Sequence, residues 1–171
     1  MKQLFLAISA AIEAVPGIKW VDFDLGQFEN EENQGVSHPA VLIRFDSASY
    51  SNLAGEEQQG DISVTIRLGF DSYGRTHSKT DAAKRATALE HLDTVQLVHL
   101  AVQGLNSSES GPMSRTGFAT EPRADLRIYA LTYSTLINDS DLVPGASTDF
   151  QPWRELLTDG DLEFCHDTKI E

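Results

Sequence analysis

The sequence predicts an α+β fold: an antiparallel β-sheet with an N-terminal helix and one long helix packed on one face, in the order α-β-β-β-α-β-β. Three observations support this class. Several segments alternate apolar and polar residues with the period of two that half-buried strands show. Two other segments carry apolar residues at helical spacing, and they do not alternate regularly with the strands. The length of 171 residues suits one domain that buries its own core.

The N-terminal segment is predicted to be an amphipathic helix that ends before Pro16 and Gly17. Its apolar residues share one helical stripe: Leu4, Phe5, Ile8, Ala11, Ile12 and Val15. Lys2 followed by an apolar stretch also has the outline of a short secretory signal, and this alternative stays open. We prefer the helix. No apolar run approaches the roughly 18–20 residues that span a bilayer, so we expect a soluble, cytoplasmic protein.

Three strands are expected next. Lys19 to Leu25 and Ala40 to Phe45 each place alternate apolar residues on one face. Asp61 to Phe70 shows the most regular alternation in the chain, which indicates one face on a core and one on solvent or a neighbour. The polar stretches Gly26 to Ser37 and Asp46 to Gly60 are expected to be loops.

A long helix is expected to begin near Thr80 or Asp81, either of which can cap it, and to end at Gly104. Its apolar residues at helical spacing are Ala82, Ala86, Leu89, Leu92, Val95 and Leu100. A hairpin then follows, with strands at about Ser114 to Thr120 and Leu126 to Ile137. The second of these strands has apolar residues on both faces and is therefore a candidate for the centre of the sheet.

Two regions are predicted: a single α+β domain over residues 1–137 and an acidic C-terminal arm over residues 138–171. From Asn138 onward, nine acidic residues stand against two basic ones. This arm also carries large apolar side chains that usually dock on another surface: Phe150, Trp153, Leu156 and Leu157. They bind either a partner or their own domain, and both alternatives stay open.

The charge balance excludes some partners. The chain has 26 acidic and 13 basic residues, a net charge of −13. Such a protein is disfavoured from binding DNA or anionic membranes nonspecifically, because that binding depends on Lys and Arg. We expect no specific nucleic acid and no membrane among its partners.

No sequence motif predicts catalysis. The phosphate loop, the dinucleotide fingerprint, the nucleophile elbow and the His-Glu-x-x-His metal motif are all absent from the sequence. The lone Cys165 makes no internal disulfide and no Cys-based zinc site. His91 and His99 lie about 12 Å apart on the predicted helix, which is too far to share a metal directly. We therefore expect no enzymatic activity, no catalytic residues, no cofactor and no metal.

The order and spacing of several segments over residues 1–137 resemble those of the tail-completion, or tail-terminator, proteins of tailed phages and prophages. The segments that carry this resemblance are Ala14-Val15-Pro16-Gly17, His38-Pro39 with Val41-Leu42-Ile43, Asp61 to Ile66, the helix Ala88 to Leu105, and Tyr129-Ala130-Leu131-Thr132-Tyr133. The resemblance implies a structural protein without catalytic residues that assembles as a ring, often a hexamer. Such a ring caps the tail tube and meets the head-side connector, first in the cytoplasm during assembly and then in the virion tail.

An acidic ring would repel the phosphates of DNA that passes through it, which suits the net charge. The candidate residues facing the lumen are Glu29, Glu31, Glu32, Glu56 and Glu57. Two alternatives to the ring remain. One is a monomeric module that docks a protein partner through the C-terminal arm; the other is an enzyme with a pocket near His91, Asp93 and His99.

Overall fold

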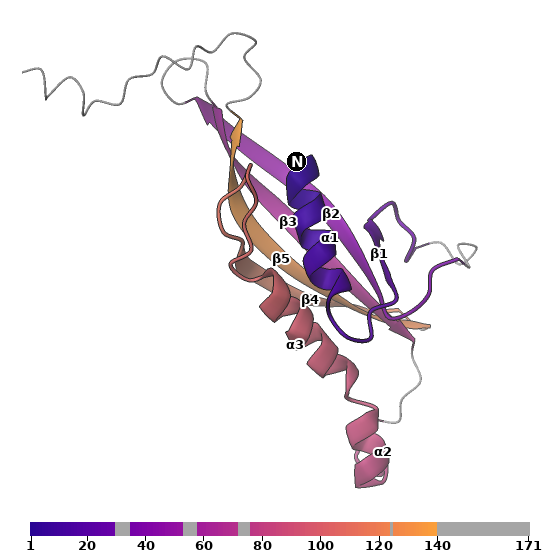
Figure 1. Ribbon diagram of the computed structural model, residues 1–171. Coiled ribbons are helices and arrows are strands. Elements are labelled where there is room, and N and C mark those ends of the chain that lie inside the picture. Colours follow the sequence, from indigo (N-terminus) through magenta and orange to yellow (C-terminus); the bar gives the residue numbers. More distant parts are fainter. Residues whose placement is uncertain (30–34, 53–57, 72–75, 124, 140–171) are drawn as a thin grey trace, which may run out of the picture. The chain divides into compact units, whose positions relative to one another are not determined.

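The computed structural model describes residues 1–29, 35–52, 58–71, 76–123 and 125–139 (Figure 1). Its elements are α1 (Lys2–Glu13), β1 (Trp20–Phe23), β2 (Ala40–Asn52), β3 (Gln58–Asp71), α2 (Ala82–Thr87), α3 (His91–Val102), β4 (Ser114–Glu121) and β5 (Leu126–Asp139). The predicted α+β class and the order of elements are confirmed. The predicted boundary after residue 137 falls at the end of the described residues and stays a prediction.

The five strands form one sheet in the order β1-β2-β3-β5-β4. The strands from β2 to β4 pair antiparallel, as predicted, but β1 pairs parallel with β2. The expectation of a purely antiparallel sheet is therefore wrong at this edge. The reason is the connection over residues 24–39, which returns the chain to the level of Trp20, where Ala40 pairs with it. A short loop would instead reverse the chain into a hairpin.

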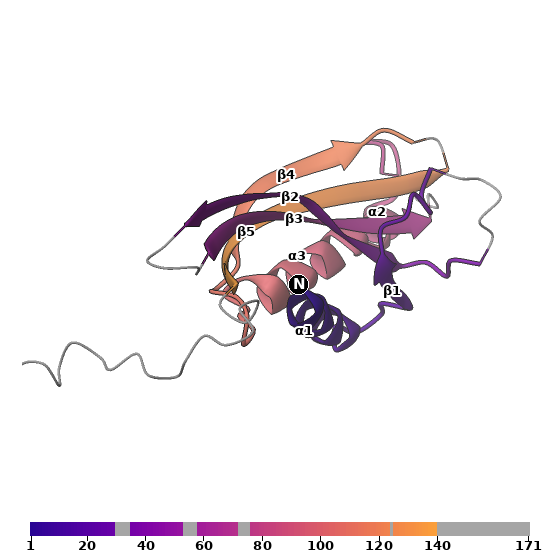
Figure 2. The ribbon, with the colours of Figure 1, turned by 90° about the horizontal axis from the view of Figure 1, so that it is seen from above.

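The main core lies between one face of the sheet and the two helices α1 and α3, which lie on the same side (Figure 2). α1 contributes Leu4, Ile8 and Ile12, each fully buried, as expected for the amphipathic helix. The strands contribute alternate residues of β2, β3 and β5, among them Ile43, Ile66 and Leu131. This period-two contribution is the pattern from which the strands were predicted.

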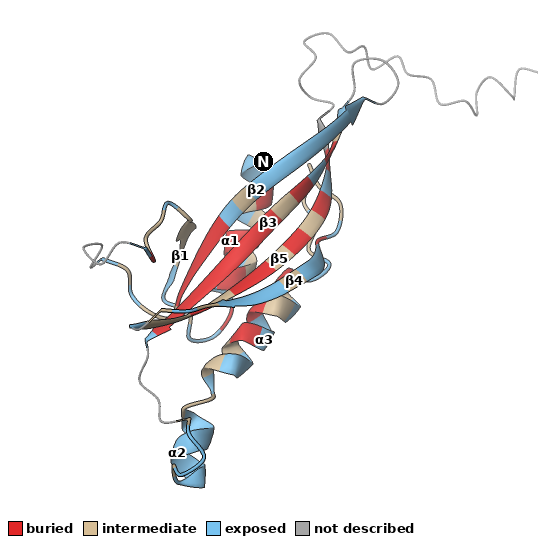
Figure 3. Ribbon diagram, turned by 180° about the vertical axis from the view of Figure 1, so that it is seen from behind, coloured by how far each residue is buried: buried red, intermediate tan, exposed pale blue. Residues whose placement is uncertain are grey.

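The predicted single long helix is interrupted. Asp81 caps α2, because its carboxylate accepts hydrogen bonds from the backbone N–H groups of Ala83 and Lys84. α2 ends at Thr87, and α3 begins at His91. No residue of α2 is buried, and α2 lies beyond the end of the sheet, so that no core holds it in line with α3 (Figure 3).

The face by which α3 packs also differs from the prediction. Val95 of the predicted stripe is buried, together with Val98 and Val102, whereas Leu92 and Leu100 of that stripe are 42% and 61% exposed. The spacing of apolar residues alone did not show whether the helix packs through the stripe with Val98 and Val102 or through the stripe with Leu92 and Leu100. The predicted end is confirmed, since Gly104 has a φ of +77°, a conformation that glycine adopts readily.

The region from Asp46 to Gly60, expected to be a loop, is mostly strand. β2 continues to Asn52 and β3 begins at Gln58. The two strands pair along this length, with a bulge at Asp46, between Phe45 and Ser47. Most of these residues are exposed, so their sequence lacks the apolar alternation that marks a strand beside a core (Figure 3). We call Arg44–Asn52 the β2 extension.

No helix in the described part of the chain is long and apolar enough to cross a membrane.

Candidate self-assembly surface

The sheet face opposite the helices, here called the outer face, carries small polar side chains over much of its length. Pairing across β2, β3 and β5 places the following residues on this face: Ser47, Ser49, Ser63, Thr65, Thr132 and Ser134. α1 and α3 lie on the other side of the sheet (Figure 2). Small side chains leave the outer face accessible for close approach of another surface.

One end of the outer face is covered by the segment that follows β1. Phe28 is 1% exposed and packs in a second cluster with Ala40, Leu42 and Ile128. A Cβ atom at Gly69 would lie 2.5 Å from Cζ of Phe28, so only glycine leaves room for the ring. The segment is thereby held against the sheet.

Arg67 is the charged centre of the outer face, and its side chain is 4% exposed. Its Nη1 donates a hydrogen bond to Oδ2 of Asp24 over 3.0 Å, and its Nε donates to Oε1 of Glu121 over 3.0 Å. Its Nη2 lies 2.6 Å from Oε1 of Glu29 and also contacts Glu121. The guanidinium stands 5.4 Å from the ring centre of Phe28, within cation–π range.

These contacts determine the charge state of Arg67. Burial lowers its pKa, but hydrogen bonds to Glu121, Glu29 and Asp24 outweigh that effect and raise the pKa above its ordinary value. One positive charge therefore faces three carboxylates, which joins the segment after β1 to β3 and β4 and leaves this part of the outer face acidic.

A second, more exposed group of charges lies beside it. Nε of Arg44 donates a hydrogen bond to Oδ1 of Asp46 over 2.6 Å, and the hydroxyl of Thr65 donates to Oδ2 of the same carboxylate over 2.5 Å. Arg44 is 47% exposed. Its guanidinium remains accessible at the edge of the sheet.

Both side edges of the sheet leave strand backbone without a described neighbouring strand. β1 accompanies β2 only from Ala40 to Ile43, and the carbonyl of Ile43 also accepts a hydrogen bond from the N–H of Asp24. Beyond that point the β2 extension pairs on one side only, with β3. At the opposite edge, β4 pairs with β5 alone, and of its outward groups the N–H of Arg115 donates a hydrogen bond to Oε1 of Gln103 over 3.1 Å. Such edges present N–H and C=O groups to which another strand can pair.

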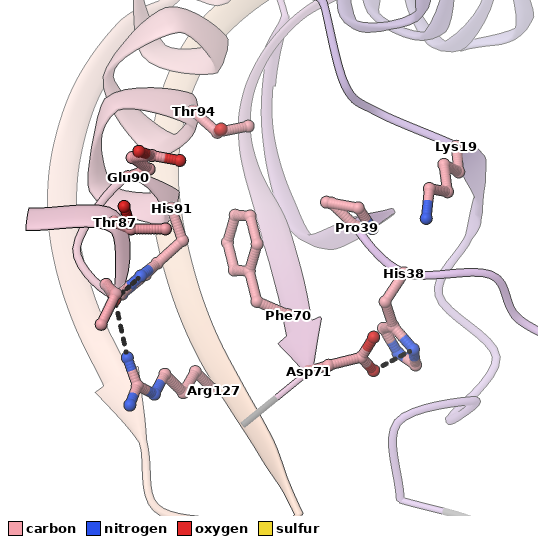
Figure 4. A pocket seen from close by; sticks show the side chains of 11 residues that line it. Lys19, His38, Pro39, Phe70, Asp71, Thr87, Glu90, His91, Thr94 and Arg127 are labelled. Carbon is pink, nitrogen blue, oxygen red and sulfur yellow. Dashed lines mark hydrogen bonds and ion pairs between the residues drawn. The ribbon is translucent and has the colours of Figure 1, made fainter. Parts of the chain in front are cut away.

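A groove of about 340 Å³ lies where the predicted enzymatic alternative would have its pocket (Figure 4). His38, Asp71, His91 and Arg127 are among its lining residues. Nδ1 of His38 lies 3.2 Å from Oδ1 of Asp71. His91 lines this groove, but Asp93 and His99 do not. The structure therefore does not bring the three predicted residues together here.

Both ring nitrogens of His91 are engaged. Nε2 lies 2.8 Å from the hydroxyl of Tyr129, and Nδ1 lies 3.0 Å from the carbonyl of Ala88. Nδ1 of His99 lies 3.1 Å from the hydroxyl of Tyr133. These histidines thus tie α3 to β5. Among the described residues, no three His, Cys, Asp or Glu side chains are placed to hold a metal ion.

The same histidines predict how stability depends on pH. Burial lowers the pKa of His91, with a further contribution from the charge of Arg127, and burial also lowers the pKa of His99. The folded protein then binds fewer protons than the unfolded chain below about pH 6.5, so acidification through that value favours unfolding. We expect the free energy of unfolding to fall between pH 7.5 and 5.5, and to fall less in a His91→Gln variant. Urea denaturation at both pH values measures this; an equal decline in the variant would contradict it.

Of the predicted lumen-facing residues, Glu29 is described: it lies on the outer face, 57% exposed, and contacts Arg67. Glu31, Glu32, Glu56 and Glu57 lie outside the described residues, as do Phe150, Trp153, Leu156 and Leu157 of the C-terminal arm. Arg67 could not be predicted as a charged centre from the sequence, because its three carboxylate partners lie far from it in the chain.

No protein-family model matches the chain, and no curated protein matches its sequence. Among solved structures, it is similar to a chain of the "Virion of native gene transfer agent (GTA) particle", with a TM-score of 0.39 and 14% sequence identity. The match covers 80% of this chain and 92% of the other.

Proposed function

We propose that this protein is a structural subunit of a phage-like particle and assembles with copies of itself into a ring, a hexamer in the form that tail terminators take. The ring would cap a tail tube and meet the head-side connector, after folding in the cytoplasm. The observation that carries the proposal is the pair of different, unpaired edges on opposite sides of one sheet.

A ring of identical subunits requires this asymmetry. Each copy must use one surface to bind the copy ahead and a different surface to bind the copy behind. The β2 extension and β4 are two such surfaces, and they lie at opposite edges of the sheet. A two-fold dimer would instead join one edge to itself and leave the other edge free. In a closed ring, the backbone N–H and C=O groups of both edges pair with those of neighbouring copies. Long exposed strand edges favour such closure, because it leaves none of these groups unpaired.

The outer face fits the inside of such a ring. It carries the acidic cluster around Arg67 and many small polar side chains, and α1 and α3 lie on the opposite face. A lumen with excess negative charge would let DNA pass without binding it. Glu29 would contribute to this surface, and we extend the same role to Glu31, Glu32, Glu56 and Glu57.

The mass of the purified protein tests the proposal. We expect light scattering to find a species of about six times the 18.8 kDa of one chain, either alone or after tail tubes are added. Negative-stain electron microscopy of that species should show a ring with a central channel. A protein that stays monomeric under both conditions would contradict the ring and favour the monomeric binding module that uses its C-terminal arm.

A further inference from the structure

We infer that the copies join through one defined strand pairing: the β2 extension of one copy pairs antiparallel with β4 of the next copy, with Arg44 opposite Glu121. This inference rests on the proposed ring and specifies how its subunits connect. The strands β2, β3, β5 and β4 of all copies would then form one closed cylindrical sheet. The face opposite the helices, called the outer face above, would line the inside of this cylinder.

The strand directions agree with this pairing. β2 runs antiparallel to β3, β3 to β5, and β5 to β4, so β4 runs opposite to β2 within each copy. When the next copy continues the sheet in the same orientation, its β4 therefore lies antiparallel to the β2 extension. Antiparallel ladders allow straight hydrogen bonds along the whole contact.

The lengths and faces of the two strands select one register. β4 has eight residues, of which Thr116 is bulged and has no partner, leaving seven pairing positions. The β2 extension has eight, because Asp46 is bulged in the same way. A shift by one position would turn every side chain of β4 to the wrong face. Seven positions of β4 fit on the eight of the extension in two registers. Only the register that sets Arg44 opposite Glu121 also keeps side chains of the same sheet face opposite each other.

This register pairs complementary side chains. Arg44, which is 47% exposed and bonded to Asp46 in its own copy, comes opposite Glu121, whose carboxylate also holds Arg67, so that the pairing would extend the ion-pair cluster across the two copies. On the helix side, Ala48 meets Phe118 and Tyr50 meets Arg115. Tyr50 and Phe118 are 47% and 56% exposed in the single chain and become diagonal neighbours in the joined sheet. The pairing thus covers two large aromatic side chains that the isolated fold leaves in water.

The same register produces the stagger that a closed cylinder requires. Within one copy, Glu121 pairs with Ile128, Ile128 pairs with Gly69, and Gly69 pairs with Ala40. Glu121 and Ala40 therefore stand at the same height along the strands. Glu121 of the next copy is level with Arg44, a displacement of four residues along the strands. Four residues are about 13 Å and four strands are about 19 Å wide, a tilt of about 35°, within the range of closed sheets.

The sense of the stagger also fits. Seen from the helices, β1 lies to the right of β2 when β2 points upward, and β4 lies to the left (Figure 1). Each next copy on the right is therefore displaced upward. That displacement tilts the strands to the right, as the right-handed twist of sheets favours when the helices are outside.

Engineered cysteines test the register in the full chain with Cys165→Ser as background. In the inferred pairing, Ser47 faces Ala119 of the next copy as a pair without backbone hydrogen bonds, with Cα atoms about 4.5 Å apart, which suits a disulfide. We expect Ser47→Cys with Ala119→Cys to give a ladder of covalently linked copies on a non-reducing gel. The matched control, Ser49→Cys with Ala119→Cys, places the two cysteines as diagonal neighbours with Cα atoms about 7–8 Å apart and should stay unlinked.

Proline variants test the backbone pairing. The N–H of Ala48 points away from β3, so Ala48→Pro removes no hydrogen bond within one copy but blocks the pairing with the next. We expect it to remain monomeric with a melting temperature close to that of the wild type. The N–H of Ser49 points toward β3, so Ser49→Pro should lower the melting temperature.

The possible results separate the pairing from the ring. Linked Ser47→Cys/Ala119→Cys copies, with the control unlinked, support the inferred register. Rings that form while both cysteine pairs stay unlinked, equal linkage of both pairs, or rings of the Ala48→Pro variant would overturn the pairing but leave the ring in place. A wild-type protein that is monomeric in every condition and unlinked in both cysteine variants would overturn both.

Discussion

Replacing Arg67 with alanine is expected to lower the free energy of unfolding by about 3–5 kcal/mol, because it leaves Glu29 and Glu121 without their counter-ion and Asp24 with only the more distant Arg44. Asp24 is most affected, since its side chain is 3% exposed and has little access to water in place of the guanidinium. The variant also loses the cation–π contact with Phe28. Urea denaturation at pH 7 measures the change.

Arg44→Ala is the matched control. Arg44 also bonds Asp46 and lies 3.6 Å from Asp24, but its side chain is 47% exposed. Exposed ion pairs contribute about 0–1 kcal/mol, so this variant should lose no more than that. If the two arginine variants lost equal stability, burial of the Arg67 cluster would not be the cause, and the account of this cluster would be wrong.

The second large effect concerns α1. Ile8→Ala is expected to cost about 3 kcal/mol, because Ile8 is fully buried between α1 and the sheet and its truncation leaves a cavity. Leu6→Ala on the same helix is the control. Leu6 is 48% exposed, so its truncation should change the free energy of unfolding by less than about 1 kcal/mol.

Thermal and urea unfolding of the two α1 variants test whether this helix belongs to the core. A stability of Ile8→Ala equal to that of the wild type would contradict its packing against the sheet. The outcome also distinguishes the two interpretations of the N-terminal sequence, an amphipathic helix or a secretory signal. A loss of stability in Ile8→Ala would favour the amphipathic helix.

The elements that could be predicted are those whose cause is local. Asp61 to Phe70 was predicted as a strand because every second residue faces the core, and β3 spans it. The cap at Asp81 and the end at Gly104 were predicted because each residue supplies a property that its helix terminus needs. In each case a single residue type or period carries the information.

The elements that were missed depend on contacts between distant segments. The β2 extension has no apolar alternation; its pairing with β3 holds it as a strand, and β3 is in turn supported by β5. The parallel placement of β1 depends on contacts of the flanking segments with the outer face, such as the packing of Phe28 and Val36 against Leu42 and Ile128. The interruption between α2 and α3 occurs where the sheet no longer lies beneath the helix.

For the candidate assembly surface the division is similar. The net charge and the acidic residue Glu29 were visible in the sequence, and so was the expectation that the protein acts through surfaces rather than through catalytic groups. The two unpaired edges, and the cluster of Arg67 with its three carboxylates, were not. A strand edge exists only once the sheet order is known, and Arg67 is separated from Asp24 and Glu121 by 43 and 54 positions in the chain.

The sequence by itself thus determined the fold class, the core-facing residues of the central strands and the acidic character of the chain, since these follow from local periodicity and composition. Only the tertiary structure decided which strands lie at the edges, which sheet face stays uncovered and which charges meet there. The physical reason is that hydrogen bonds between strands and ion pairs between distant segments depend on how the chain returns to itself, and no local pattern of residues records that path.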